Sequence, residues 1–553
     1  MTTTNNTRIY NLKAFRELRI VTLEKATKFD EKEECIKIRI LSNTNLNKNE
    51  KNTCTAEIFG RELILDKDYY FGFNEKFSIY TYTGCIIQIK GKTLQEYESK
   101  NTTMKDYLSL SYIFDAYRKL AKKKKKVGPR ILITGNNNSG KSSVSLLLCN
   151  YALKSGFKPI FIETDTKCSC DKIELNNGPG IMSCFVYDNM NMKYSLDFFF
   201  GYLDINEDIN LYYHINECLS SCIHLMLLNN LNFQSTNFKN NTEQEIIHSS
   251  GFILNVPSEA DHKIIENLIE IYNINIVVVI DNSFLHYSLK EHYNKIDANN
   301  SEGVNCGSIL NNNNNKGTDF NNDDNNLNNH DSNHNDNSNN NNNNVADNNN
   351  EKIKNSNNYN NVNNNNNDNN KNKNINNDKI RNVEIIGMPK FEGVIPSDNN
   401  RLRYCRNLWF YNYFSKDIYV NGNVYKKSHI LNFKYSSTNF VKLDTNSAVP
   451  LSALPADCKN KKIENVSVSL YNSNIKNLIN CILGVSYSKD FLYVHLMNIA
   501  AFVHVQNIKE IESEENEENK NDYLIEILCP VSITSNNIPP YFIVPGNIKQ
   551  IKF

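Results

Sequence analysis

The strongest constraint on the fold comes from the stretch GNNNSGKSS, Gly135 to Ser143. It fits the pattern G-x-x-x-x-G-K-[ST], in which consecutive backbone N–H groups cradle phosphates. In that pattern the lysine, here Lys141, reaches the β- and γ-phosphate oxygens, and the hydroxyl, here Ser142, helps to hold magnesium. The apolar stretch ILIT precedes the loop, and a helical pattern follows it. The order of strand, loop and helix therefore predicts a phosphate-binding loop in an α/β fold.

The segments that follow continue this alternation. The apolar stretches KPIFIE, GFILNV and INIVVVID alternate with the helical patterns VSLLLCNYALKSG and IIENLIEIY. Strands that are apolar on both faces belong inside a parallel sheet that helices cover. We therefore expect a central P-loop NTPase-like domain, a parallel sheet with helices, over residues 106–415.

The flanking segments are rich in strand patterns. Period-two alternation from about Arg19 to Gly91 predicts an N-terminal β-sandwich or barrel over residues 1–105, and SYIFDAYRKLAKKKKK predicts a helix that ends before Gly128. Residues 416–553 are expected to form a small strand-rich C-terminal domain, with IKEIESEENEENKND as a solvated acidic loop. Residues 297–382, mostly Asn, are predicted to be a disordered insert without a function of its own.

Composition excludes several classes of protein. Lys+Arg and Asp+Glu balance at 61 each, so the whole chain has no basic character typical of nucleic-acid binding. The 14 Cys lack zinc-site spacing, which predicts reduced thiols in an intracellular protein, and the close pair Cys168 and Cys170 is expected to be structural. We find no signal peptide and no membrane-spanning run. The run Lys122–Lys126 allows a nuclear-import signal or a phosphate-facing patch, but a solvated helix end is favoured.

Two further sets of charged residues fit phosphoryl transfer. The strand PIFIE ends at Glu163, and Asp165 follows. An acid at this place holds magnesium or accepts the proton of an attacking hydroxyl, although a capping role remains an alternative for either residue. In RLRYCRNLW, the side chains of Arg403 and Arg406 share one helix face, near Arg401. They suit a lid that neutralises charge on a transferred phosphoryl group, or else a solvated basic helix.

With these motifs in place, the sequence resembles the cleavage and polyadenylation factors of the RNA 5′-hydroxyl polynucleotide kinase family. The resemblance rests on FRELRI, AEIFGREL, YTYTGCIIQIKG, the block from GPRILITG to KPIFIETD, NGPGIM, INIVVVID and an LP at Leu454. It covers nearly the whole chain except the Asn-rich insert. It implies three domains, bound ATP and Mg²⁺, protein partners in the cleavage and polyadenylation complex, RNA 5′ ends as a further partner, and a nuclear location.

The resemblance also implies site residues. For catalysis these are Lys141, Asp165, Arg403 and Arg406, and for Mg²⁺ they are Ser142 and Asp165. The implied nucleotide-binding residues are Glu17, Lys76, Asn138, Ser139, Gly140, Lys141, Ser142 and Ser143.

Departures from the family pattern concern the RNA side. The family motif D-x-G-Q is replaced by Asp165-Thr-Lys167-Cys168, and a run ending in Gly-Trp, whose Trp stacks on an RNA base, is replaced by residues 255–259, NVPSE. A lid arginine expected near Ser397 is also missing. Loss of an aromatic platform removes about 1 to 3 kcal/mol of stacking per base.

These departures favour an ATP-bound subunit of the nuclear mRNA 3′-end machinery with weakened or lost kinase chemistry. The alternative is an active kinase that transfers the γ-phosphate of ATP to RNA 5′-hydroxyls, and a relative of pre-ribosomal RNA kinases is a third. An aromatic such as Tyr202 or Trp409 in the RNA groove would favour the kinase. Glu259 facing that groove would favour the subunit with lost chemistry, because its carboxylate repels phosphate.

Overall fold

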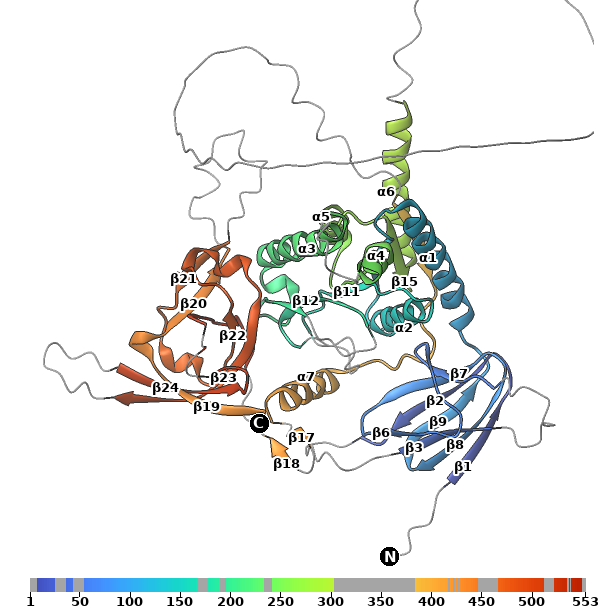
Figure 1. Ribbon diagram of the computed structural model, residues 1–553, viewed down its shortest axis with the longest axis horizontal. Coiled ribbons are helices and arrows are strands. Elements are labelled where there is room, and N and C mark those ends of the chain that lie inside the picture. Colours follow the sequence, from blue (N-terminus) through green and yellow to red (C-terminus); the bar gives the residue numbers. More distant parts are fainter. Residues whose placement is uncertain are drawn as a thin grey trace, which may run out of the picture. The chain divides into compact units, whose positions relative to one another are not determined.

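The computed structural model describes most of the chain outside the expected insert (Figure 1). The described residues are 7–24, 36–42, 54–167, 178–188, 195–232, 241–302, 383–415, 418–420, 423–425, 427–445, 466–511, 522–534, 537 and 539–549. The insert beyond Glu302, the pair Cys168 and Cys170, and the LP segment at Leu454 lie outside them.

The N-terminal segment forms the expected β-sandwich. One sheet has the order β1-β8-β3-β6 and the other β5-β4-β7-β2-β9. Alternation decides which side chains face inward: in β3 every second residue is buried, and Ile38 packs in the core with Leu18 and Ile79. The strands are β1 (Thr7–Leu12), β2 (Arg16–Thr22), β3 (Ile36–Leu41), β4 (Glu57–Ile58), β5 (Arg61–Glu62), β6 (Asp68–Phe71), β7 (Lys76–Thr81), β8 (Cys85–Gly91) and β9 (Thr93–Ser99).

The central segment is the expected P-loop domain. Its sheet has the order β13-β12-β11-β14-β10-β15-β16, and β11, β14, β10, β15 and β16 run parallel. The strands are β10 (Arg130–Gly135), β11 (Ile160–Glu163), β12 (Ile181–Val186), β13 (Leu196–Phe199), β14 (Phe252–Asn255), β15 (Ile276–Ile280) and β16 (Glu384–Met388). The helices are α1 (Met104–Lys124), α2 (Lys141–Lys154), α3 (Ile209–Asn232), α4 (Asn241–Ser250), α5 (His262–Ile271), α6 (Ser283–Glu302) and α7 (Asn399–Phe414), with a short 3₁₀ turn at Ile205–Glu207.

Three details differ from the sequence expectation. The sheet is mixed and not wholly parallel, because β12 runs antiparallel to both of its neighbours, β11 and β13. Residues 187–195 join β12 to β13 and are too few for a crossover. Helix α6 extends to Glu302, past the expected start of the insert at 297. Helix α1 begins at Met104, before the predicted segment, and the buried residues Met104, Tyr107 and Leu110 extend its apolar stripe toward the N-terminus. It packs against α2 and α4.

The C-terminal segment is strand-rich, as expected. Its sheet has the order β19-β24-β23-β22-β25-β20-β21, with β17 and β18 as a separate pair. The strands are β17 (Ile418–Val420), β18 (Asn423–Tyr425), β19 (Ser428–Lys434), β20 (Asn439–Asp444), β21 (Ser467–Leu470), β22 (Ile482–Ser486), β23 (Ile499–Ile511), β24 (Asp522–Pro530) and β25 (Tyr541–Ile543), with 3₁₀ turns at Tyr435–Ser437, Ile475–Leu478 and Phe491–Leu496. The domain boundaries given above remain a proposal.

The expected acidic loop is shorter than the sequence predicts. Strand β23 continues to Ile511 and pairs with β24, and Lys509 forms an ion pair with Glu526 across the two strands. Cross-strand pairs of opposite charge stabilise such a ladder even where the residues are polar. None of the helices in the described part of the chain has the length and apolar character needed to cross a bilayer.

Burial of Asp197 on β13 gives the first testable prediction. Burial raises the pKa of this carboxyl from 3.8 to about 6, and the hydroxyl of Ser195 donates a hydrogen bond to it. Because the folded state binds the proton more tightly, the free energy of unfolding decreases as the pH rises from 3.8 to about 6. We expect Asp197→Asn to remove roughly 2 kcal/mol of this decrease. Urea unfolding of wild type and variant at pH 4 and pH 7 measures the difference, and parallel pH profiles would contradict it.

Candidate phosphate-binding site

The loop has the backbone that the motif requires. It leaves β10 at Gly135, enters α2 at Lys141, and has positive φ at Asn138 (54°) and Gly140 (96°). A Cβ at Gly140 would lie 2.6 Å from Cβ of Phe391. Glycine is therefore required at this position both by the backbone conformation and by a close neighbour. The strand, loop and helix order predicted from the sequence is confirmed.

The amine of Lys141 is held at the mouth of the loop. It donates to the carbonyl oxygens of Gly135 at 3.2 Å and Asn136 at 3.0 Å, and to Oγ of Ser258 at 2.7 Å. Burial lowers the pKa of Lys141, and the negative charges of Asp165, Glu259 and Glu163 oppose this shift. These neutral acceptors are weaker partners for an ammonium than phosphate oxygens are, so Lys141 is poised to exchange them for an anion.

The two acids after β11 have different environments. Glu163 is buried and accepts hydrogen bonds of 2.9 Å at both carboxyl oxygens from Nδ2 of Asn255. Burial raises the pKa of Glu163 well above its usual value, and the charge of Asp165 adds to this. Asp165 instead lines the cavity in front of the loop. Glu163 therefore serves the packing of β11 and β14, while Asp165 is the acid available to a ligand.

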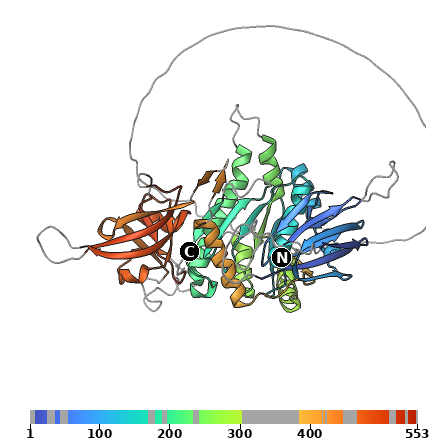
Figure 2. The same cartoon turned by 90° about the horizontal axis from the view of Figure 1, so that it is seen from below.

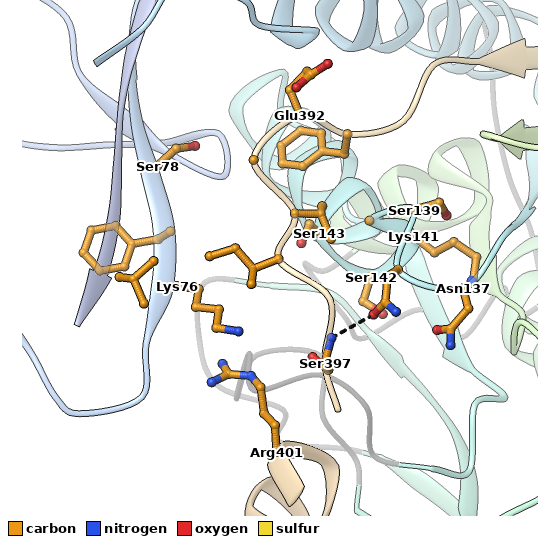
Figure 3. Close-up of a pocket in the computed structure, with 18 of the residues that line it drawn as sticks. Lys76, Ser78, Asn137, Ser139, Lys141, Ser142, Ser143, Glu392, Ser397 and Arg401 are labelled. Carbon is orange, nitrogen blue, oxygen red and sulfur yellow. Dashed lines mark hydrogen bonds between the residues drawn. The ribbon is translucent and has the colours of Figure 1, made fainter. Parts of the chain in front are cut away.

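A cavity of about 310 Å³ lies in front of the loop, and its walls come from segments far apart in the sequence. Strands β2 and β7 contribute Arg19 and Lys76, and residues 391–402 form a further wall. Figure 3 shows Lys76 from the N-terminal segment and Arg401 from α7 on the side of the cavity away from Lys141. Figure 2 shows the ribbons of Figure 1 from below. Cations thus line opposite sides, as a polyphosphate requires.

The segment between β16 and α7 closes over the loop. The backbone N–H of Phe391 donates to the carbonyl of Ser139 at 3.0 Å, and that of Ser397 donates to Oδ1 of Asn138 at 3.2 Å, the dashed line in Figure 3. No periodicity in residues 389–398 predicted this contact. The only sequence signal was their position between the last parallel strand and the arginine-rich helix.

The predicted lid arginines do not reach the cavity. Arg403 is exposed, and neither it nor Arg406 is among the lining residues. Arg401 takes this place: its guanidinium donates to the carbonyl of Asn74 at 2.9 Å, and Asp398 caps the start of α7 beneath it. Helical spacing favoured Arg403 and Arg406 because they share one face of α7, but it is Arg401, in the first turn of α7, that lines the cavity.

Glu17 was predicted to contact the nucleotide, but it does not line the cavity and instead pairs with Arg19, which does. It is buried, forms a 2.5 Å ion pair with Arg19, and accepts a 3.0 Å hydrogen bond from Thr102. Burial raises the pKa of Glu17, whereas Arg19 and Thr102 favour its charged form. Arg19, which was not predicted from the sequence, lines the cavity instead, together with Ile20 and Val21 of the same strand. The remaining predicted residues, Lys76, Asn138, Ser139, Gly140, Lys141, Ser142, Ser143 and Asp165, all line it.

The aromatic candidates for an RNA platform lie elsewhere. Trp409 stacks on Tyr413 with ring centroids 5.1 Å apart and meets Phe502 edge-on. Tyr202 packs so closely on Gly546 that a Cβ there would overlap its ring. Neither residue lines the cavity.

Glu259 does line the cavity, at the end near Asp165. It forms an ion pair with Lys167, whose amine also lies 3.6 Å from a carboxyl oxygen of Asp204. Lys167 and Glu259, which both stand at positions that depart from the family motifs, therefore contact each other. Glu259 thus lines the phosphate-binding cavity with its carboxylate paired to the amine of Lys167.

Comparison with known proteins agrees with this architecture. Residues 11–121 match the N-terminal beta-sandwich domain of polyadenylation factor, and residues 135–308 match the P-loop of the mRNA cleavage and polyadenylation factor CLP1. Together the two matches span about half of the chain.

Among full-length relatives, the Dictyostelium discoideum protein CLP1 homolog is 30% identical over 254 residues, 44% of this chain and 51% of the relative. The Homo sapiens polyribonucleotide 5′-hydroxyl-kinase Clp1 is 27% identical over 245 residues, 43% and 54% of the two chains. The chain thus spans about half the length of the curated relatives it matches.

Among solved structures, Clp1p in complex with residues 454–563 of Pcf11p has the same fold. The TM-score is 0.61 with 18% identity, and 99% of each chain is covered. A second structure, which concerns the interface of Pcf11p and Clp1p and the loss of ATP in a point mutant, gives a TM-score of 0.59 with 17% identity. With its sandwich, its phosphate-binding loop and its C-terminal sheet, this chain belongs to the Clp1 family of mRNA cleavage and polyadenylation factors.

Proposed function

We propose that the chain is an ATP-binding subunit of a nuclear mRNA 3′-end cleavage and polyadenylation complex, with weakened or lost kinase chemistry. One observation carries the proposal: the cavity joins the N-terminal sandwich, the phosphate-binding loop and residues 391–402. Its acceptor end, the end near Asp165 where an RNA hydroxyl would have to bind, holds the ion pair of Lys167 and Glu259. A nucleotide in this cavity would connect three parts of the chain and stabilise their arrangement.

The residues present fit ATP. The loop amides and Lys141 would hold the phosphates, with Lys76 and Arg401 on the opposite side. Oγ of Ser139 is buried within the loop and makes no hydrogen bond to the described residues. ATP would supply a transferable γ-phosphoryl group there. The chain's own contribution is to bind and orient that group.

Mg²⁺ would be held by few protein ligands. Ser142 and Asp165 both line the cavity, and no cluster of three or more His, Cys, Asp or Glu side chains suited to a metal occurs among the described residues. Mg²⁺ commonly keeps several waters and uses one or two protein oxygens together with substrate phosphates. The donor set therefore fits Mg²⁺ that arrives with the nucleotide.

The acceptor end is less suited to RNA. The carboxylate of Glu259 lines the cavity and would repel the phosphates of an RNA there, and neither Trp409 nor Tyr202 lines it. Lys167 offsets part of that charge, because it pairs with Glu259. The alternative, an active polynucleotide 5′-hydroxyl kinase, is supported by Lys141, Ser142 and Asp165 lining one cavity. Under that alternative, Asp165 would accept the proton of the RNA hydroxyl.

The partner proposal rests on the solved relatives. Two structures with the same fold are complexes of Clp1p with Pcf11p, itself a separate chain. We propose that this chain assembles with a cleavage-factor protein of that kind, in the nucleus.

Nucleotide binding is tested directly by thermal unfolding with and without Mg-ATP, and by the ATP content of the purified protein. ATP at 100 times its Kd should stabilise the protein by about 2.7 kcal/mol. Lys141→Ala should remove most of that stabilisation, while its unfolding without ATP changes little. Equal stabilisation of wild type and variant, or none of either, would contradict nucleotide binding at this loop.

The role of Arg401 gives a second prediction. Arg401 lines the cavity and Arg403 is exposed outside it, so the two make a matched pair. Arg401→Ala is expected to weaken ATP binding about tenfold, the loss of one charge-assisted contact, and Arg403→Ala to weaken it less than twofold. Isothermal titration of both variants measures this. A larger effect from Arg403→Ala would show that the lid works as the sequence alone predicted.

A further inference from the structure

The outer face of α1 carries an uncompensated positive charge. Lys119 and the run Lys122–Lys126 are all exposed, and none of these six lysines forms an ion pair with the described residues. The contrast with Arg118 on the same helix is sharp: that side chain is buried and pairs with Asp115 at 2.9 Å. The chain thus compensates the inward cation of α1 and leaves the outward ones to solvent.

Stabilisation of the helix end accounts for part of this run only. Lysines in the last turn interact favourably with the helix dipole, and here they are Lys122, Lys123 and Lys124. Lys119 lies before that turn, and Lys125 and Lys126 follow it. Like charges four residues apart repel, as in the pair Lys119 and Lys123. A bound polyanion would relieve this repulsion.

Exposed apolar and aromatic side chains precede the lysine run on α1. Tyr112 is 66% exposed and Tyr117 39%, with Ile113 and Leu120 exposed beside them. The hydroxyl of Tyr117 donates to Glu384 on the edge strand β16 at 2.9 Å, which fixes the position of its ring. Because an α-helix has 3.6 residues per turn, Tyr112 lies on the same side of α1 as Lys119 and Lys123, whereas Tyr117 lies about 140° around the axis from Tyr112.

We propose that the outer face of α1, defined as Tyr112, Lys119 and Lys122–Lys126, binds single-stranded RNA without sequence preference. Lysines that contact the backbone together with aromatic rings that stack on bases are the combination such sites use. Because positive and negative charges balance over the whole chain, this local excess of lysines is where a phosphate backbone is attracted most strongly. The surface does not depend on the nucleotide cavity.

The geometry separates this surface from the phosphate-binding loop. The start of α1 lies beside the cavity wall, since Oγ1 of Thr103 accepts from the backbone N–H of Glu392 at 3.3 Å. The helix then runs from Met104 to Lys124, about 30 Å, so the lysine run lies at the end of α1 remote from that wall (Figure 1). RNA on α1 would be anchored along its length and would leave the phosphate-binding loop accessible.

The test uses the full chain and a fluorescent 20-nucleotide RNA with a 5′-phosphate, in the presence of ATP. The test variant replaces Lys122 through Lys126 with Gln, which keeps helix propensity. A matched control replaces five exposed lysines from other surfaces, Lys13, Lys90, Lys100, Lys290 and Lys489, and changes the net charge by the same amount. Thermal midpoints of both variants and their response to ATP verify folding and an intact cavity.

We expect the test variant to bind RNA at least tenfold more weakly at low salt, with a salt dependence reduced by about 0.7 per lysine that contacts phosphate. The control should change affinity less than threefold. Tyr112→Ala should cost roughly tenfold, and Tyr112→Phe should bind as wild type. Tyr117→Ala, on another side of the helix, should also bind as wild type and serves as the matched aromatic control. Equal loss in test and control variants would overturn the proposal. The proposal would also be overturned if a polyglutamate peptide competed as well as RNA and Tyr112→Ala did not change the RNA affinity. That result would assign the surface to an acidic protein.

Discussion

Replacement of Gly140 by Ala is expected to lower the free energy of unfolding by about 2 to 4 kcal/mol and to weaken ATP binding at least tenfold. The residue has φ of 96°, and an added Cβ would lie 2.6 Å from Cβ of Phe391 and 3.0 Å from Cγ2 of Val394. The methyl group would have to push the 391–394 segment off the loop. That segment is one wall of the cavity, so stability and nucleotide binding fall together.

Gly156 provides the matched control for this change. It also has positive φ, 81°, but an added Cβ has no atom within 4 Å. Gly156→Ala should therefore cost only the backbone strain, about 1 kcal/mol, and leave ATP affinity unchanged. Urea unfolding and titration with ATP measure both effects. Equal destabilisation by the two substitutions would show that the contact with Phe391 carries no energy.

Arg118→Ala is expected to destabilise the fold by about 3 to 5 kcal/mol, because it leaves the carboxylate of Asp115 buried without its cation. Arg118 is 1% exposed, and its guanidinium also donates to the carbonyl of Ser250 at 3.2 Å, which ties α1 to the end of α4. Burial lowers the pKa of Arg118, and the charge of Asp115 opposes this shift.

The double variant Arg118→Met, Asp115→Leu tests the cause. It removes both charges and keeps apolar volume, so it should be much less destabilised than Arg118→Ala. A double-mutant cycle with the two single variants measures the coupling between the side chains. A coupling near zero would contradict the account, since the loss would then come from packing alone.

Local sequence patterns predicted those parts of the fold that depend on neighbouring residues. The phosphate-binding loop could be read from the sequence because its glycines, its lysine and its flanking strand and helix are contiguous. The parallel strands β10, β11, β14 and β15 were predicted because burial on both faces leaves a continuous apolar run. The antiparallel strands β12 and β13 were missed, since their pairing depends on the path of the chain and not on composition.

The site was predicted where one segment forms it and missed where several segments meet. Lys141, Ser142 and Asp165 lie in the strand and loop motifs, and the structure brings them to one cavity. Arg19, Arg401 and Ser258 reach the same cavity from other parts of the chain, and only three-dimensional contacts single them out from their neighbours. Helical spacing favoured Arg403 and Arg406, but it contains no information about which turn of α7 faces the loop.

The central claim is that the chain binds ATP at the loop but transfers its γ-phosphate poorly or not at all. The most direct measurement is transfer of labelled γ-phosphate from ATP to a short 5′-hydroxyl RNA by the purified protein, with ATP content assayed on the same sample and Lys141→Ala as the control. The account predicts that wild type carries ATP and transfers no more label than the variant. Transfer by wild type that disappears in Lys141→Ala would contradict it and establish an active polynucleotide kinase.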